Sequence, residues 1–395
     1  MKIIIAGAGI GGLTAAAALL DKGFQVTVLE QARALGEIGA GVQLSPNATR
    51  VLYQLGVGKL LEPLACVPLG KRVRLWNTGQ TWPLFDLGAA SRDIYGYPYW
   101  TVHRADLHEA LVAAVRAMSA DAIRLNEKVE EIDQTGESVT VRTACGHVYE
   151  GDILIGADGV HSRVRRALFG PDDPVYSGVM AWRGVIRADA LPEHLRTAYG
   201  SNWVGPGAHV IHYPLRGQTL VNFVGAVERD GWTTESWTQQ GTREECLNDF
   251  AGWHEDVQTL IRAIETPYKW ALMVREPMTQ WTSGNATLLG DACHPTLPFL
   301  AQGAGMAIED GYLIARCLAQ YQGDLARALA RYEDLRRERT ARVVRGSAAN
   351  TQRFHNPELA RAEGAAAYVD REWSEERVKE RYNWLFEYNV DTVEV

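Results

Sequence analysis

The sequence predicts a mixed α/β fold in which a parallel sheet with covering helices is interleaved with an antiparallel β-sheet and followed by a helical C-terminal region. A strand, turn and helix pattern opens the chain over residues 2–22. Apolar and polar residues alternate in strand-like segments within residues 179–229, and apolar residues recur at helical spacing over residues 324–344. The first pattern is typical of parallel sheets and the second of antiparallel ones.

Composition narrows the function classes. The chain has 395 residues, enough for two or three packed units, and its 46% hydrophobic and 22% charged residues exclude disordered and collagen-like chains. The net charge of −8 gives no general attraction for nucleic acid or anionic lipid, so we expect neither a nucleic acid nor a membrane as partner. The five cysteines are scattered without a CxxC pair, which predicts no metal site and a reducing, cytoplasmic location.

A glycine-rich turn joins the first strand to the first helix. The β-branched residues 2–6 are followed by the pattern GxGxxG and an alanine- and leucine-rich helix at residues 13–22. Such a turn brings the backbone close to a pyrophosphate and places the positive end of the helix dipole against it. We therefore expect four glycines to bind a dinucleotide: Gly7, Gly9, Gly11 and Gly12.

The second strand, residues 24–29, ends in an acidic residue. Glu30 follows Gly12 by 18 positions, near the spacing of a carboxylate that binds a ribose hydroxyl, and Gln31 is expected beside it. A carboxylate repels a 2′-phosphate, so the bound nucleotide should be FAD or NAD rather than NADP. The glycine-rich stretch 33–47 predicts a longer cofactor cleft, lined by Gly41, Val42 and Gln43.

Two later segments place an aspartate after an apolar strand. Residues 152–163 read DILIGADGVHSR, and residues 288–295 read LLGDACHP, followed by AQGAGMAIED at residues 301–310. With the first glycine motif, these segments resemble the DG and GD motifs of the single-component (group A) flavin-dependent aromatic hydroxylases. The resemblance implies a Rossmann-like FAD-binding domain of the GR2 type, with FAD bound by Asp158, Asp291, Gly303, Ala304 and Gly305.

The resemblance also implies further cofactor residues and co-substrates. Residues 101–108 match the family's HR-x-DL segment, which places Arg104 at the cofactor phosphates or the isoalloxazine rim. Leu125 and Val129 fall where relatives touch the adenine. There is no second GxGxxG in the sequence, so NADH or NADPH is expected to bind transiently, with O₂ as the other co-substrate.

The antiparallel segment is expected to form the floor of the substrate cavity, as it does in relatives. They hydroxylate through a flavin C4a-hydroperoxide, which requires an electron-rich phenol and therefore a base near its hydroxyl. Strand alternation places His209 and His212 on opposite faces, so at most one faces the cavity. We favour His209 with Tyr213, where hydroxybenzoate-hydroxylating relatives have a histidine and a tyrosine; the alternatives are His212 or no histidine.

Three more residues are candidates in this cavity. Arg183 has two interpretations of equal weight: it binds a substrate carboxylate, or it braces the sheet. Asn47 is expected to contact the substrate. Pro295 matches the family's proline beside the reactive flavin carbon, although it could simply end a strand.

The expected activity is hydroxylation of an aromatic hydroxy acid, with salicylate converted to catechol and CO₂ as the first choice. The tail, residues 381–392, resembles those of salicylate hydroxylases. Alternatives are another hydroxybenzoate or a hydroxylated N-heterocycle, of the 3-hydroxybenzoate or hydroxynicotinate type, or a non-catalytic flavin-binding protein. Gln43 and Pro298 differ from the histidine of hydroxynicotinate relatives and the glutamine of 3-hydroxybenzoate relatives, respectively.

The motif positions predict how the chain divides. We expect an FAD-binding domain from residues 1–75, 101–175 and 276–345, a substrate-binding sheet domain from 76–100 and 176–275, and a helical segment at 346–395. A monomer and a homodimer both remain open.

Overall fold

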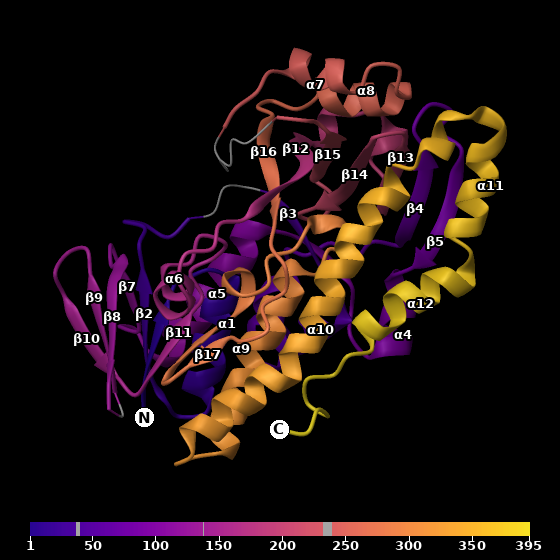
Figure 1. Ribbon diagram of the computed structural model, residues 1–395. Coiled ribbons are helices and arrows are strands. Elements are labelled where there is room, and N and C mark those ends of the chain that lie inside the picture. The colour runs from indigo at the N-terminus through magenta and orange to yellow at the C-terminus, as the bar shows by residue number, and fades with distance from the viewer. Residues whose placement is uncertain (37–39, 137, 232–238) are drawn as a thin grey trace.

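The computed structural model describes residues 1–36, 40–136, 138–231 and 239–395. Part of the glycine-rich stretch that the sequence singles out, residues 37–39, lies outside the described residues. Figure 1 shows a parallel sheet with its helices in one half of the molecule, an antiparallel sheet in the other, and the long helix α10 (Leu325–Phe354) running alongside both.

The parallel part is a six-stranded sheet with the order β17-β18-β11-β1-β2-β7, in which β17 alone is antiparallel to its neighbour. Its central strand pairs Ile3 with Ile153 of β11 on one side and with Val26 of β2 on the other. The strands are β1 (Lys2–Ala6), β2 (Gln25–Glu30), β7 (Ile123–Leu125), β11 (Ile153–Gly156), β17 (Thr282–Ser283) and β18 (Ala286–Leu288).

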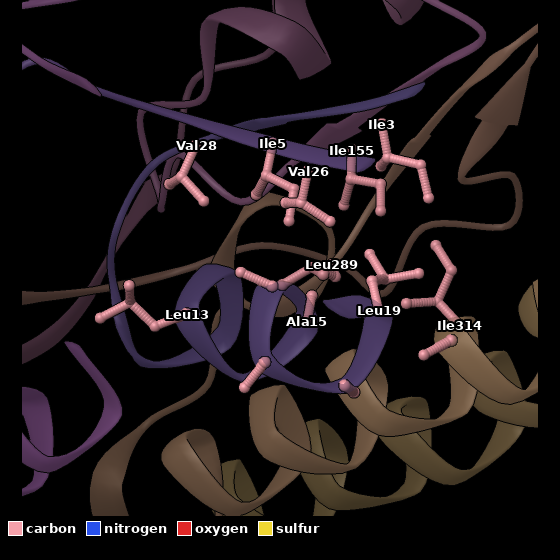
Figure 2. Close-up of a cluster of buried hydrophobic side chains, with 14 of the residues drawn as sticks. Ile3, Ile5, Leu13, Ala15, Leu19, Val26, Val28, Ile155, Leu289 and Ile314 are labelled. Carbon is pink, nitrogen blue, oxygen red and sulfur yellow. The ribbon is translucent and has the colours of Figure 1, made fainter. Parts of the chain in front are cut away.

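Helix α1 (Ile10–Asp21) packs on this sheet, and Figure 2 shows its side chains pointing toward those of β1, β2 and β11. Its alanines let α9 (Gly303–Gln320) approach closely on the other side. A Cβ on Gly311 of α9 would lie 2.6 Å from the Ala15 nitrogen. The helix that opens the cofactor motif is thus held between a sheet and a second helix, and its N-terminus is fixed.

The antiparallel part is a seven-stranded sheet with the order β16-β12-β15-β14-β13-β4-β5, in which all neighbours are antiparallel except β13 and β4, which are parallel. One face packs on α7 (Arg243–Asp249) and α8 (Glu255–Arg262), and the other on the C-terminal helices α10, α11 (Ala362–Glu372) and α12 (Glu375–Phe386). The strands are β4 (Gly70–Leu75), β5 (Thr81–Asp86), β12 (Val175–Arg187), β13 (Tyr199–Gly205), β14 (Ala208–Leu215), β15 (Leu220–Glu228) and β16 (Tyr268–Val274).

Smaller elements complete the fold. A three-stranded sheet and a two-stranded ribbon flank the cofactor region: β8 (Val129–Thr135), β9 (Ser138–Thr143) and β10 (Val148–Gly151), and β3 (Gly41–Leu44) with β6 (Trp100–His103). The other α-helices are α2 (Pro46–Gln54), α3 (Val57–Leu61), α4 (Gly88–Tyr95), α5 (Arg104–Met118) and α6 (Arg163–Phe169). Across the described ranges, no helix is both long and apolar enough to span a bilayer.

Two expected boundaries are wrong. Strand β4 belongs to the antiparallel sheet, where Arg74 pairs with Trp203 of β13, so that unit begins near residue 70 and not at 76. Helix α10 continues past the expected boundary at 345 and ends at Phe354. Its first half packs with the parallel sheet through Tyr332, and its second half packs with the antiparallel sheet through Val343.

Candidate active site

The glycines of the first turn have distinct structural roles. Gly7 has φ +103°, and a Cβ there would lie 2.4 Å from the Ala157 carbonyl oxygen. A Cβ on Gly12 would lie 2.1 Å from the Gly7 oxygen, and one on Gly11 would lie 2.7 Å from a Leu289 methyl group. A Cβ on Gly9 would meet nothing within 4 Å. Backbone packing therefore requires glycine at positions 7 and 12, Gly11 faces the end of a leucine side chain, and the backbone at Gly9 borders open space at the start of α1.

Glu30 lies at the end of β2 and organises the turn. Its carboxylate accepts hydrogen bonds from the backbone N–H groups of Ala8 and Ala32, each at 2.8 Å. It lines a cavity of about 640 Å³ together with Gly7, Gly9, Gln31, Val129 and Asp158. Leu125 pairs with Glu30 and packs against the core, and it is not among the residues that line this cavity, so its contact with the adenine stays a prediction.

Asp158 also holds the start of α6. It accepts hydrogen bonds from the N–H groups of Arg163 at 2.7 Å and Val164 at 3.1 Å, and from the Ser162 hydroxyl. Burial raises the pKa of its carboxyl group. Asp158 therefore has a structural role that the motif did not predict, while one side of it still faces the cavity.

A second cavity of about 330 Å³ adjoins the first, since Gly9, Ala157 and Gly159 line both. Most of the expected cofactor residues that are absent from the first cavity line this one: Gly11, Gly41, Val42, Gln43, Arg104, Asp291, Gly303 and Ala304. Burial raises the pKa of the Asp291 carboxyl group. Gly305 does not line the cavity. A Cβ on Gly305 would lie 3.1 Å from Oε1 of Gln302, so the small size of this glycine leaves room for the Gln302 side chain.

The N-terminus of α9 faces the second cavity through Gly303 and Ala304. The first helical hydrogen bond there is donated by the Met306 N–H to the Gln302 oxygen at 2.8 Å. The preceding N–H groups therefore have no partner within the helix, which is the arrangement that favours an anionic or electron-rich ligand group.

The opposite wall of the second cavity is one face of the antiparallel sheet. His209, Ile211 and Tyr213 alternate along β14 and all line it, together with Arg183 of β12 and Trp270 of β16. The Arg183 guanidinium lies 5.2 Å from the Trp270 ring centre. Burial raises the pKa of the Tyr213 hydroxyl.

The expectation for His212 is wrong, because strand alternation turns it to the other face. Its neighbours Val210 and Phe223 belong to the apolar cluster under α7 and α8, and His212 does not line the cavity. Burial, with the nearby Arg74 cation, lowers its pKa to about 4.

The expectation for Asn47 is also wrong. Its side chain is buried and donates hydrogen bonds to Gln302 at 3.1 Å and to Glu309 at 2.6 Å, so it joins α2 to α9 and does not line the cavity. Glu309 is itself bridged to Arg336 at 2.7 Å and to Arg339 at 2.8 Å. Asn47 is thus part of a buried ionic network behind the site.

Pro295 does not contact the cavity either. It is buried, whereas Thr296 and Pro298 line the wall. The 3-10 turn Pro298–Leu300 places Pro298 there. The segment that the sequence indicated therefore reaches the cavity, but Pro295 itself does not line it.

One group of side chains among the described residues has metal-like spacing: Cys293, His294 and Asp310. All three are buried, and Asp310 is already bonded to His294 at 2.6 Å and to Arg336 at 2.6 Å. These bonds hold the pKa of Asp310 at about 2. The positive charge of the Arg336 guanidinium compensates the buried negative charge of the Asp310 carboxylate.

His209 has a polar environment that the sequence did not suggest. Its Nδ1 lies 2.7 Å from Nε2 of His355, and its ring packs edge-on against Phe299. Among the residues that the structure describes, its Nε2 has no hydrogen-bond partner. Burial and the neighbouring His355 lower its pKa well below the usual value.

Sequence reasoning missed several residues. Lys71 of β4 lines a small chamber next to the cavity, with its ammonium 4.9 Å from the Tyr99 ring centre, and burial lowers its pKa to about 7. His355 follows the end of α10 and touches the site only through His209. Lys71 and the core residue Val73 are two positions apart on β4 and share a face, which could have suggested that Lys71 points inward. No local signal in the sequence marked His355.

Comparisons with known proteins match this geometry. A family model described as "FAD binding domain" matches residues 1–347. The chain is 37% identical to 3-amino-4-hydroxybenzoate 2-monooxygenase of Streptomyces platensis, covering 99% of this chain and 97% of that protein. The chain belongs to the flavin-dependent aromatic hydroxylases. This flavin-dependent hydroxylase is also 36% identical to 3-hydroxybenzoate 6-hydroxylase of Klebsiella oxytoca, over 99% and 98% of the two chains.

Solved structures agree with this assignment. The flavin-dependent hydroxylase superposes on Klebsiella pneumoniae HpxO in complex with FAD and uric acid with a TM-score of 0.83, at 27% identity and over 99% and 96% of the two chains. A salicylate hydroxylase substrate complex gives a TM-score of 0.81 at 26% identity, over the same shares. FAD is therefore the cofactor, with NAD(P)H and O₂ as co-substrates. The open space at Gly9 and the free N–H groups of α9 fit such a ligand.

Proposed function

We propose that this enzyme hydroxylates a hydroxybenzoate, a benzene ring that carries both a phenol and a carboxylate. When bound, FAD supplies the oxygen-transfer chemistry. The arene occupies the second cavity, between the FAD-binding residues and the antiparallel sheet. The observation that carries the proposal is the unpartnered, fully buried Nε2 of His209 on the wall of a cavity that also contains a buried arginine.

In this arrangement His209 accepts the phenolic proton. Tyr213 lies two pleats away on the same strand face and hydrogen-bonds the substrate hydroxyl, because burial keeps its own hydroxyl protonated. Arg183 binds the carboxylate, and the ring lies against Trp270 and Phe299, which line the same cavity.

The pocket residues bear on which arene is bound. Gln43 and Pro298 both line the cavity, and Gln43 is fixed by a 2.8 Å hydrogen bond from the Tyr99 hydroxyl. Gln43 replaces the histidine of hydroxynicotinate hydroxylases, and Pro298 replaces the glutamine of 3-hydroxybenzoate hydroxylases. This favours 3-amino-4-hydroxybenzoate or salicylate as substrate, in line with the relative of Streptomyces platensis and the salicylate hydroxylase structure.

The test is oxidation of NADH and NADPH by the purified holoenzyme with salicylate, 3-amino-4-hydroxybenzoate, 3-hydroxybenzoate and 6-hydroxynicotinate. Product, CO₂ and H₂O₂ are measured together, so that coupled hydroxylation is separated from simple oxidase activity. Catechol with CO₂ identifies salicylate, and a hydroxylated acid without CO₂ identifies another hydroxybenzoate. Coupled turnover of the pyridine acid alone, or of no member of the panel, would contradict the proposal.

The role of His209 is tested by His209→Gln, with His212→Gln as the matched control on the opposite face of the same strand. Loss of the base should lower kcat at neutral pH by a factor of about 10²–10⁴ and leave FAD content unchanged. A His209→Gln enzyme with full coupled hydroxylation at neutral pH would show that another group takes the proton.

A further inference from the structure

Three side chains link the substrate cavity to solvent. His209 is fully buried at the cavity wall, and its Nδ1 lies 2.7 Å from Nε2 of His355. Nδ1 of His355 lies 2.9 Å from Oε1 of Glu228, whose side chain is 53% exposed. The chain therefore begins at a histidine on the cavity wall, whose Nε2 has no partner among the described residues, and ends at a solvent-exposed carboxylate.

The backbone fixes this alignment. His209 lies on β14, Glu228 ends β15, and His355 directly follows α10. The Gly207 N–H donates to the His355 oxygen at 3.1 Å, and the Gly207 oxygen accepts from the Glu228 N–H at 2.9 Å. One glycine in the β13–β14 turn thus ties together the segments that carry the three side chains.

The surroundings of the two rings are apolar. Phe299 and Phe354 pack edge-on against His209, with ring centres at 4.7 and 5.1 Å, and Phe299 also lies 6.4 Å from His355. The ionisable group facing His209 is His355, and the one facing His355 on its other side is Glu228. Burial lowers the pKa of both histidines, so neither is suited to keeping a positive charge.

We propose that His209, His355 and Glu228 form a proton relay that carries the phenolic proton of the substrate out of the cavity. This inference rests on the proposed function. His209 is the catalytic residue of the relay, because it meets the substrate, and His355 and Glu228 act through it. In the starting state each histidine carries its proton on Nδ1, His209 donating to His355 and His355 donating to the Glu228 carboxylate.

The transfer balances without a further reactant. The phenolic O–H bond breaks and a bond from Nε2 of His209 to that proton forms. The Nδ1 proton of His209 passes to Nε2 of His355, and the Nδ1 proton of His355 passes to Oε1 of Glu228. The carboxylic acid then loses its proton to water. Both imidazoles end neutral, so the phenolate forms without a charged histidine remaining in the apolar interior.

The test follows proton release when a hydroxybenzoate binds to the oxidised holoenzyme, with a pH indicator in weak buffer and stopped-flow mixing. Glu228→Gln and His355→Gln break the relay at different links. Asp230→Asn removes another exposed carboxylate two residues from Glu228 and is the matched control. We expect both relay variants to release the proton at least tenfold more slowly and to have a lower kcat, with arene Kd and FAD content within twofold of wild type, and Asp230→Asn to behave as wild type.

Wild-type proton release in both relay variants would overturn the proposal. A second readout does not depend on the substrate: NMR of protein labelled with ¹⁵N at histidine reports which nitrogen of each ring is protonated. The relay requires the Nδ1–H form for both His209 and His355, and an Nε2–H form of either ring would overturn it. If the wild type turns over no hydroxybenzoate, the proposed function fails, and the NMR result still decides whether the relay is assembled.

Discussion

Different parts of the chain line the two ends of the ligand-binding region of this enzyme. At the dinucleotide end much of the lining is backbone, since glycines of the first turn border the first cavity and the N-terminus of α9 faces the adjoining one. The antiparallel sheet instead lines the second cavity with side chains that project from one face, among them Arg183, His209 and Tyr213. The comparison teaches that substitutions in the first unit act through folding and FAD retention, and those in the second through substrate chemistry.

The largest expected effect is in the glycine-rich turn between β1 and α1. In Gly12→Ala the new Cβ would lie 2.1 Å from the Gly7 oxygen, and both atoms belong to a rigid turn. We expect this substitution to lower the free energy of unfolding of the apoprotein by about 3 kcal/mol and to abolish FAD retention. Thermal unfolding and the ratio of flavin to protein absorbance measure the two effects.

Gly9→Ala is its matched control, because the added methyl group meets no protein atom within 4 Å. The apoprotein should unfold at the wild-type temperature while its affinity for FAD falls. If both variants destabilised the apoprotein equally, the distinction between packing glycines and ligand-facing glycines would be lost.

An intermediate effect is expected for Arg183, on the sheet face that lines the second cavity. Arg183→Met removes the cation that we place at the substrate carboxylate and keeps most of the apolar volume beside Trp270. Arene Kd should rise about 10- to 100-fold, which corresponds to the roughly 1.5–3 kcal/mol of a charge-assisted hydrogen bond, with FAD content unchanged. Flavin absorbance changes on titration with the arene measure Kd. An unchanged Kd would show instead that Arg183 only braces the sheet.

The last effect concerns Lys71, beside the cavity, and is small at any one pH step. Its pKa falls from 10.5 to about 7 on folding, so between about pH 7 and pH 10 the unfolded chain binds more protons than the folded one. Across this window the free energy of unfolding of the wild type should therefore rise with pH more steeply than that of Lys71→Met. The difference between the two slopes should be at most about 1 kcal/mol per pH unit. Below pH 7 the two slopes should agree. Urea unfolding at several pH values measures this, and parallel curves throughout would mean that Lys71 is not desolvated.

A larger share of the expected cofactor residues than of the expected substrate residues lines a cavity, and there is a physical reason. The residues around Gly7 and Asp291 lie in short contiguous motifs, where a turn and a helix start determine their geometry locally. His209 and Tyr213 could be selected because a strand alternates its faces. Asn47 was placed wrongly because its partner Glu309 lies 262 residues away.

The polar partners of His209 were beyond sequence reasoning for the same reason. His355 is 146 residues from His209 and 127 from Glu228, and nothing in the helix that precedes it signals a contact with β14. The sequence does not reveal the 3-10 turn at residues 298–300 that places Pro298, and not Pro295, on the cavity wall.

The order of strands in the parallel sheet has a consequence for biosynthesis. Strand β1 pairs with β11, which begins at Ile153, and β11 pairs with β18, which begins at Ala286. A ribosome adding about 5–20 residues per second therefore needs tens of seconds between making the first strand and making the last one that completes this sheet. Until β11 is made, one edge of the very apolar strand β1 has no partner, and until β18 is made one edge of β11 has none, so the yield of folded enzyme should depend on chaperones and on growth temperature.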